Sequence, residues 1–262
     1  MGNPAIIDYI VNWLNKYSDQ SHTQGFVIGI SGGIDSALTS TLCALTGKNV
    51  ICLNMPIHQH QAEYDRGQQH IQWLKNKFKN VSSAEIELTK TFESISDALP
   101  KDIQDRLTMA NTRARLRMTT LYAFASHHKM LVAGTGNKIE DFGIGFFTKY
   151  GDGGVDLSPI ADLMKSEVYE LAAQLGVVKD IQQAAPTDGL FADGRSDEDQ
   201  IGATYNELEW IMQFIASKGD PSLLNSRQKE VMTIYQQRHA ANRHKIDPIP
   251  VCIIPEELRK TE

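Results

Sequence analysis

Cysteine is scarce in this chain, and long apolar runs are missing from it. The three cysteines, Cys43, Cys52 and Cys252, are odd in number and lack Cys-x-x-Cys spacing, which argues against a disulfide framework or a zinc site. Cys43 and Cys52 lie within apolar segments, as core residues do. No basic segment followed by an apolar run opens the sequence, and no stretch approaches the ~20 apolar residues of a membrane helix. We therefore expect a cytoplasmic protein that has no signal peptide and no membrane span.

Basic residues are outnumbered: 26 Lys and Arg oppose 32 Asp and Glu, for a net charge of −6. This balance argues against a general nucleic-acid surface, although it leaves room for a local basic pocket. The hydrophobic fraction of 41% and the charged fraction of 22% are typical of a globular protein. No repeat or low-complexity segment interrupts the chain, and we expect a single domain over residues 1–262.

Apolar periodicity predicts alternating strands and helices in the first half of the chain. Strands are expected at residues 26–30, 50–54, 84–88 and 130–134, and helices at residues 4–17, 34–46, 64–78 and 111–127. Further helices are expected at residues 164–175, 204–217 and 221–242. This order predicts the α/β class: an open, mostly parallel Rossmann-like sheet with helices on both faces, followed by a helical C-terminal part.

The first predicted strand runs into a glycine-rich turn, and residues 26–36 read Phe-Val-Ile-Gly-Ile-Ser-Gly-Gly-Ile-Asp-Ser. A helix follows, so the turn presents backbone N–H groups at a helix N-terminus, which is a typical phosphate site. The two adjacent glycines let an anion approach the backbone, and the two serines add hydroxyl donors. Asp35 would repel a phosphate unless a cation lay between them, so the pattern indicates Mg²⁺ with a nucleotide polyphosphate. The alternative is a glycine-rich turn in an ordinary α/β protein.

The turn is not a Walker loop, because no lysine follows its second glycine, and it lacks the Gly-x-Gly-x-x-Gly order of a dinucleotide fingerprint. It resembles the pyrophosphate-binding loop of the ATP pyrophosphatase superfamily. Members of that superfamily split ATP between its α- and β-phosphates. They adenylate a substrate oxygen, and a nitrogen or sulfur nucleophile then displaces AMP.

A second glycine-rich stretch, residues 134–160, carries several charged side chains. It follows the fourth predicted strand, and the carboxyl ends of parallel strands are where such sheets bind ligands. We therefore expect this stretch, the glycine-rich turn and residues 54–56 to converge on one site. The stretch could be a mobile lid over charged substrates or merely a flexible connection. Its charged residues are Lys138, Glu140, Asp141, Lys149, Asp152 and Asp156.

Several motifs together resemble ammonia-dependent NAD synthetase, and the resemblance covers nearly the whole chain. They are SGGIDS at 31–36, RARLRM at 113–118, GTGNKIE at 134–140, FFTKYGDGG at 146–154, Pro186-Thr187 and His244-Lys245. The resemblance implies a homodimer that joins ammonia to nicotinic acid adenine dinucleotide (deamido-NAD), consuming ATP and releasing AMP and pyrophosphate. Between Glu140 and Lys149 the chain is one residue longer than the family form, which puts the local path of that stretch in question.

The resemblance also implies roles for individual residues. Asp35 and Glu140 correspond to Mg²⁺ ligands, and both offer the hard oxygen donors that Mg²⁺ requires. Asp35, Lys149 and Asp156 are the implied catalytic residues. The implied ATP contacts are Gly29, Ile30, Ser31, Gly32, Gly33, Ile34, Asp35, Ser36, Thr135, Lys165 and Thr187. The implied contacts to deamido-NAD are Arg115, Lys149, Asp156, His244 and Lys245. Arg113, Arg115 and Arg117 are two apart and splay around a helix, so we expect some of them at the surface or at an interface.

Two other functions remain open from the sequence. One is another adenylating member of the superfamily, such as a tRNA-thiolating enzyme, although those often need cysteine pairs and a basic face. The other is a nucleotide-binding protein without turnover, for which a pair of metal ligands would be superfluous. Glutamine-dependent relatives carry a large amidase domain with a Glu-Lys-Cys site, for which this chain has no room, but a separate glutaminase subunit stays possible.

Overall fold

A parallel sheet forms the centre of the computed structural model, which describes residues 3–186 and 196–259. Its strands are β1 (Gly25–Gly29), β2 (Asn49–Asn54), β3 (Val81–Glu85) and β4 (Leu131–Val132). All neighbours pair in parallel, in the order β3-β2-β1-β4. The α/β class and the parallel sheet are thus confirmed. The third strand, expected at 84–88, instead spans Val81–Glu85, and its first residue, Val81, pairs with Val50.

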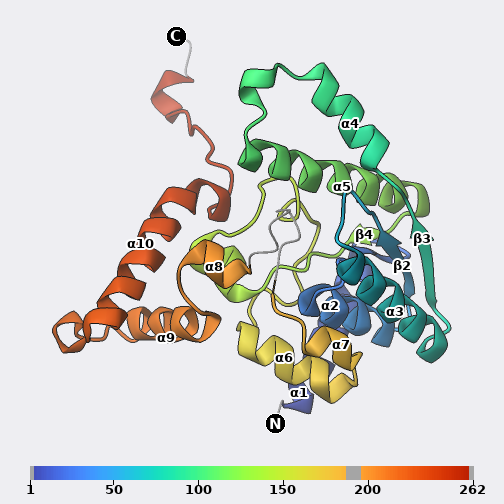
Figure 1. The fold of residues 1–262 in the computed structure, drawn as a ribbon, viewed down its shortest axis with the longest axis horizontal. Coiled ribbons are helices and arrows are strands. Elements are labelled where there is room, and N and C mark those ends of the chain that lie inside the picture. The colour runs from blue at the N-terminus through green and yellow to red at the C-terminus, as the bar shows by residue number, and fades with distance from the viewer. Residues whose placement is uncertain (1–2, 187–195, 260–262) are drawn as a thin grey trace.

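Helices connect and flank the strands (Figure 1). In the first half they are α1 (Pro4–Gln20), α2 (Ile34–Leu45), α3 (Gln61–Lys77), α4 (Thr89–Ala98) and α5 (Arg106–His128). The later helices are α6 (Lys165–Leu175), α7 (Lys179–Gln182), α8 (Asp197–Ile201), α9 (Tyr205–Ala216) and α10 (Ser226–Ile246). Short 3₁₀ turns are η1 (Lys101–Ile103), η3 (Pro221–Leu223) and η4 (Glu256–Leu258), and η2 (Ile139–Ile144) is a π-helix. Helix α4 has no counterpart in the sequence-based expectation.

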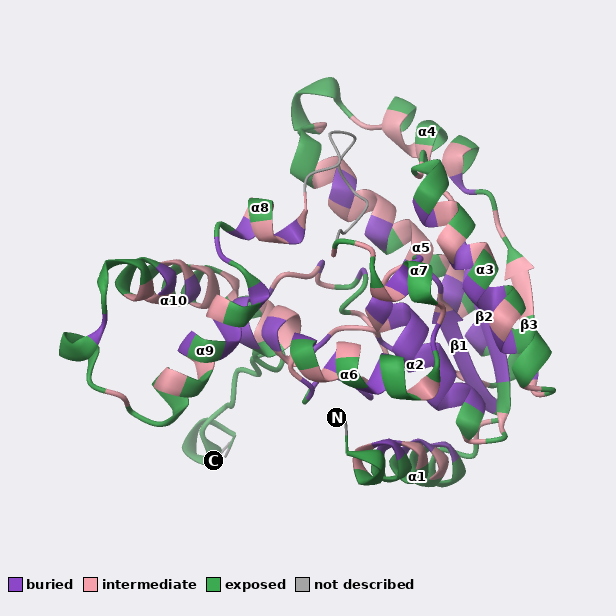
Figure 2. Ribbon diagram, turned by 60° about the horizontal axis from the view of Figure 1, so that its bottom comes forward, coloured by how far each residue is buried: buried purple, intermediate pink, exposed green. Residues whose placement is uncertain are grey.

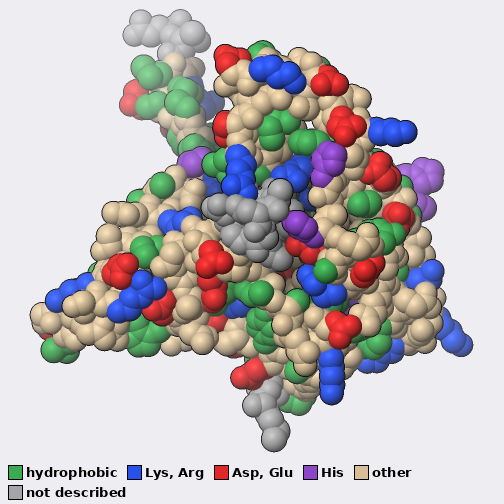
Figure 3. Space-filling model, in the orientation of Figure 1, with side chains coloured by type: hydrophobic (Ala, Val, Ile, Leu, Met, Phe, Trp, Pro, Cys, Tyr) green, Lys and Arg blue, Asp and Glu red, His purple; other side chains and the backbone are tan. Residues whose placement is uncertain are grey.

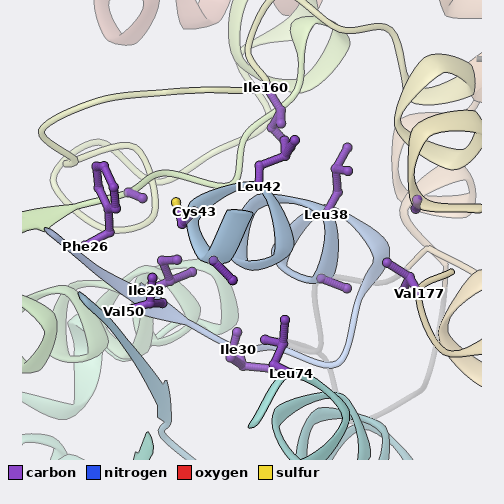
Figure 4. Packing of buried hydrophobic residues seen from close by; sticks show 14 of the residues in the cluster. Phe26, Ile28, Ile30, Leu38, Leu42, Cys43, Val50, Leu74, Ile160 and Val177 are labelled. Carbon is purple, nitrogen blue, oxygen red and sulfur yellow. The ribbon is translucent and has the colours of Figure 1, made fainter. Parts of the chain in front are cut away.

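Side chains alternate between the two faces of the sheet, as expected for strands buried on both sides. Phe26 and Ile28 of β1 pack in one cluster with Leu38 and Leu42 of α2 (Figure 4). Helices α1, α3 and α6 contribute to the same cluster. Val27 belongs instead to a second cluster built mainly with α5. Helices therefore cover both faces, as predicted, and the two central strands are almost wholly buried in Figure 2.

The helical C-terminal part has its own apolar cluster. Leu208 and Ile211 of α9 and Tyr235 of α10 pack around Ile139 and Ile144, the ends of η2. In Figure 1, α9 and α10 lie to one side of the molecule and the sheet lies on the other. The glycine-rich segment therefore runs from the edge of the sheet to the C-terminal helices, against which η2 packs. None of the helices in the described part of the chain combines the length and apolar character needed to cross a membrane.

The segment expected to hold one additional residue folds as the π-helix η2, which ends at Gly145 with a φ of 62°. A π-turn closes its hydrogen bond over five residues rather than four, so it accommodates one more residue than an α-turn. Such turns occur frequently at functional sites. Here the wide turn keeps Ile139 and Ile144 fully buried while Glu140, between them, remains 15% exposed at its side chain.

Candidate active site

The glycine-rich turn between β1 and α2 is tightly organised. The Ser36 hydroxyl donates to the carbonyl of Gly33 at 3.0 Å and lies 3.1 Å from the Ser31 hydroxyl. Gly32 has a φ of +85°, and a Cβ there would lie only 2.3 Å from the Glu63 carbonyl oxygen of α3. Glycine is thus required at this position by the backbone and by the close approach of α3. The turn presents the N-terminus of α2 to the cavity described below, as a phosphate loop does.

Lys165 joins the two acids that the sequence pairs as metal ligands. Its Nζ lies 2.7 Å from Oδ2 of Asp35 and 2.9 Å from Oε1 of Glu140. Asp35 lies in the first turn of α2, Glu140 in η2 and Lys165 at the start of α6, so three distant segments meet. The side chains are 18%, 15% and 4% exposed, in that order. The structure thus brings the predicted acids together around a single cationic position.

Asn137 and Tyr205 orient these acids. The Asn137 side chain donates to Oδ1 of Asp35 at 3.0 Å and accepts the backbone N–H groups of Ile139 and Glu140, each at 3.1 Å. The Tyr205 hydroxyl donates to Oε1 of Glu140 at 2.5 Å. Sequence reasoning had not assigned either residue. Asn137 belongs to the GTGNKIE motif, whereas Tyr205 lies on α9, where the surrounding sequence gives no indication of this contact.

Charge and burial act in opposite directions within this group. Burial raises the pKa of Asp35 above the ordinary aspartate value, and the proximity of Glu140 adds to this effect. Burial would also raise the pKa of Glu140, but the Lys165 ammonium and the hydrogen bonds from Tyr205 and Asn137 outweigh it and lower that pKa. Burial alone would lower the pKa of Lys165, yet the two carboxylates raise it well above the ordinary lysine value. The site therefore strongly favours a cation between the acids.

A basic wall faces this group, and backbone carbonyls hold its members. Lys149 Nζ donates to the His244 carbonyl, and Lys245 Nζ donates to the Phe147 carbonyl at 2.7 Å. Arg115 Nε donates to the Lys149 carbonyl at 3.2 Å. Carbonyl oxygens carry no full charge, so these bonds position the cations without neutralising them. The FFTKYGDGG segment and the end of α10 thus form one anion-attracting surface.

A cavity of about 590 Å³ collects most of the predicted residues. Its wall includes Gly29, Ile30, Ser31, Gly32, Gly33, Ile34, Asp35, Ser36, Arg115, Thr135, Glu140, Lys149, Lys165, His244 and Lys245. Figure 3 shows Lys and Arg side chains near the middle of this face of the molecule. The expected convergence of the strand ends on one site is therefore observed.

Two predicted residues stand apart from this wall. Asp156 is not among the residues that line the cavity; its carboxylate accepts the Tyr122 hydroxyl at 2.9 Å and the Val132 backbone N–H at 2.8 Å. It fixes β4 here, and its contact with a substrate stays a prediction. Thr187 lies outside the described residues.

Two arginines on the wall were not assigned from the sequence. Arg117, although part of the quoted RARLRM motif, points inward, and its Nε donates to the Met55 carbonyl at the end of β2 at 3.0 Å. Burial, together with the nearby Arg113, lowers the pKa of Arg117 to about 10. Arg66 lines the cavity from α3, where no motif marked it. Glu63, also on α3, is buried, which raises its pKa. The positive charges of Arg66 and Arg117 oppose this rise without cancelling it.

The parallel sheet, the glycine loop at its edge and the acid pair beside that loop place the chain among α/β enzymes that bind a nucleoside polyphosphate. Comparison with known proteins narrows the class. The sequence model of NAD synthase matches residues 6–248. The NH(3)-dependent NAD(+) synthetase of Mycoplasma genitalium is 38% identical over 85% of this chain and 86% of its own length. The protein of the same name from Alkaliphilus metalliredigens is 37% identical over 93% and 97%.

Solved structures agree with this result. An NMN synthetase from Francisella tularensis superimposes with a TM-score of 0.82 at 30% identity, covering 96% of this chain and 98% of its own. An NH3-dependent NAD synthetase from Campylobacter jejuni gives a TM-score of 0.78 at 25% identity, covering 95% and 99%. The chain belongs to the NAD synthase family.

Proposed function

We propose that the residues of this cavity carry out ammonia-dependent NAD synthesis, a carbon–nitrogen ligation that consumes ATP. The curated relatives reported above carry this activity in their names. The observation that supports it in the structure is the convergence of the glycine loop, the Asp35–Glu140 pair and the basic wall on one cavity. This arrangement suits a reaction between two anionic nucleotides better than simple nucleotide storage.

The acid pair fits Mg²⁺. Among the described residues, no cluster of three or more His, Cys, Asp or Glu is placed to hold a metal. Mg²⁺ is usually bound in proteins by one or two carboxylates, with substrate phosphates and water completing its shell. Asp35 and Glu140 supply such a pair beside the glycine loop, at a position already suited to a cation. Bound there with ATP, Mg²⁺ would neutralise phosphate charge.

In the first step a carboxylate oxygen of the nicotinate attacks the α-phosphorus of ATP. The oxygen–phosphorus bond forms as the bond from the α-phosphorus to the bridging oxygen breaks, and pyrophosphate leaves with the electron pair. The loop N–H groups and Lys165 would hold the phosphates, while Lys149, His244 and Lys245 would hold the second nucleotide. In the second step the ammonia nitrogen attacks the acyl carbon as the bond from that carbon to the AMP oxygen breaks. AMP leaves with the oxygen it received from the carboxylate, and the nitrogen loses one proton to solvent.

Turnover assays test this proposal directly. The protein should release AMP and form NAD from ATP, deamido-NAD and ammonium, and should require a divalent cation. Glutamine in place of ammonium should give little product unless a separate glutaminase subunit is added. Absence of turnover with ammonium would contradict the proposal.

A mononucleotide substrate merits a parallel assay, because one similar structure is an NMN synthetase. Nicotinic acid mononucleotide presents the same carboxylate and would be amidated by the same two steps. We propose deamido-NAD as the preferred substrate, in line with the names of the curated relatives. A higher kcat/KM for the mononucleotide would reverse this preference.

We further propose that the enzyme works as a cytoplasmic homodimer. The segment after α10 exposes several apolar side chains, among them Ile249, Val251 and Ile253, which are 66%, 73% and 79% exposed. Apolar side chains at such exposure along one short segment are a feature that association with a second subunit would cover. Sedimentation analysis tests the proposed dimer.

A further inference from the structure

Arg66 of α3 lies against the phosphate loop. Its Nε donates to the Gly32 carbonyl at 3.3 Å, and its side chain lines the same cavity as the loop. The backbone of α3 packs closely on the loop: a Cβ on Gly32 would collide with the Glu63 carbonyl, and one on Gly67 would lie 3.7 Å from the Gly32 nitrogen. This packing fixes the base of the Arg66 side chain beside the loop.

The cavity cations Lys165, Lys149, Lys245 and Arg117 differ from Arg66 in their position or in what they contact. Lys165 is bound by two carboxylates, and Lys149 and Lys245 donate to backbone carbonyls of the FFTKYGDGG segment and the end of α10. Arg117 is anchored at the end of β2, facing Glu63. The Nη atoms of Arg66 have no hydrogen-bond or ion-pair partner among residues 3–186 and 196–259. Arg66 is thus the side-chain cation placed directly at the loop with donors to spare.

We infer that Arg66 is a further catalytic residue that binds the terminal phosphates of ATP and then the pyrophosphate leaving group. This inference rests on the proposed placement of ATP on the loop. As the bond between the α-phosphorus and the bridging oxygen breaks, negative charge accumulates on the departing pyrophosphate. A guanidinium with two Nη groups can donate to two phosphate oxygens at once, which a lysine cannot reproduce.

Product inhibition separates this role from simple support of the loop. Arg66→Gln keeps a donor for the Gly32 carbonyl but removes the charge. We expect its inhibition constant for pyrophosphate to rise about tenfold or more, its KM for ATP to rise, and its inhibition constant for AMP to stay unchanged. Arg66→Lys should recover only part of the loss. Lys75→Gln, which removes the same charge from an exposed position of α3, should leave both constants unchanged.

Two results would overturn the inference. An unchanged pyrophosphate constant in Arg66→Gln would leave Arg66 only the bond to Gly32, and equal weakening of pyrophosphate and AMP would indicate a general distortion of the cavity. Ser31→Ala, a change in the loop itself, separates a failure of the Arg66 inference from a failure of the proposed placement of ATP. If Ser31→Ala weakens pyrophosphate and Arg66→Gln does not, the inference fails while the loop proposal stands. If neither variant weakens it, the proposed placement of ATP on the loop fails.

Discussion

Replacing Lys165 with methionine removes the cation between two largely buried carboxylates while keeping an unbranched side chain that is only one heavy atom shorter. The Nζ contacts at 2.7 Å and 2.9 Å are lost together. Removing one partner of a buried ion pair costs about 3–5 kcal/mol, because the remaining charge is left uncompensated. For a chain of this size, about 2–4 °C of Tm is lost per kcal/mol, so we expect a fall of roughly 10 °C.

The response to metal and to pH gives this prediction its specificity. Since the two carboxylates would then face each other alone, Mg²⁺ should raise the Tm of Lys165→Met more than that of the unmodified protein. The pKa of Asp35 is already raised and would rise further without the lysine. A raised carboxyl pKa contributes stability below the unfolded pKa and loses it as pH rises through the folded pKa. The deficit of the variant should therefore grow from acidic to mildly alkaline pH.

Thermal unfolding followed by circular dichroism, with and without Mg²⁺, measures these effects. Lys138→Met is the matched control, because Lys138 pairs at 2.7 Å with an Asp162 side chain that is 96% exposed. Exposed pairs contribute only about 0–1 kcal/mol, so this control should lose little. Equal losses in the two variants, or no greater response of Lys165→Met to Mg²⁺, would refute the reasoning.

Four further predictions follow from the same structure. Asp35→Ala should fold but lose at least about 100-fold in turnover, and unchanged turnover would refute the metal role. Gly32→Ala should lower Tm and raise the KM for ATP because its Cβ would collide with α3, whereas Gly33→Ala, which meets only a side-chain oxygen at 3.4 Å, should keep its Tm. Burial lowers the pKa of His70 from 6.5 to about 4, so the unfolded state binds more protons between these values. The free energy of unfolding should accordingly fall by about 3 kcal/mol from about pH 7 to about pH 4, and His70→Asn should flatten this part of the urea-derived profile. In sedimentation the active species should be a dimer, and a fully active monomer would contradict the proposed assembly.

The sheet and its loop were predictable because their signals are local. An apolar strand, two glycines and a helix start occupy consecutive positions, and the loop between β1 and α2 formed where this pattern predicted. Helix α4 was missed because it is only ten residues long, contains few apolar residues and buries none of them. The third strand was misplaced because the apolar alternation continues past its end, at Ile86 and Leu88.

The site was predictable only where a motif marked a residue. The pairing of Asp35 with Glu140 came from the family resemblance and was matched by their common contact with Lys165. Tyr205 and Arg66 could not be found in this way, because each reaches the cavity through the packing of a whole helix. The short-range sequence around them specifies that helix but not what its side chains will meet.

The fate of a heavy oxygen isotope placed in the carboxylate of deamido-NAD tests the central claim most directly. Mass spectrometry of the products with ATP, Mg²⁺ and ammonium would follow it. Attack of that carboxylate on the α-phosphorus predicts one labelled oxygen in AMP for each NAD formed, with pyrophosphate unlabelled. Label in inorganic phosphate together with ADP, or unlabelled AMP, would contradict adenylation at this site.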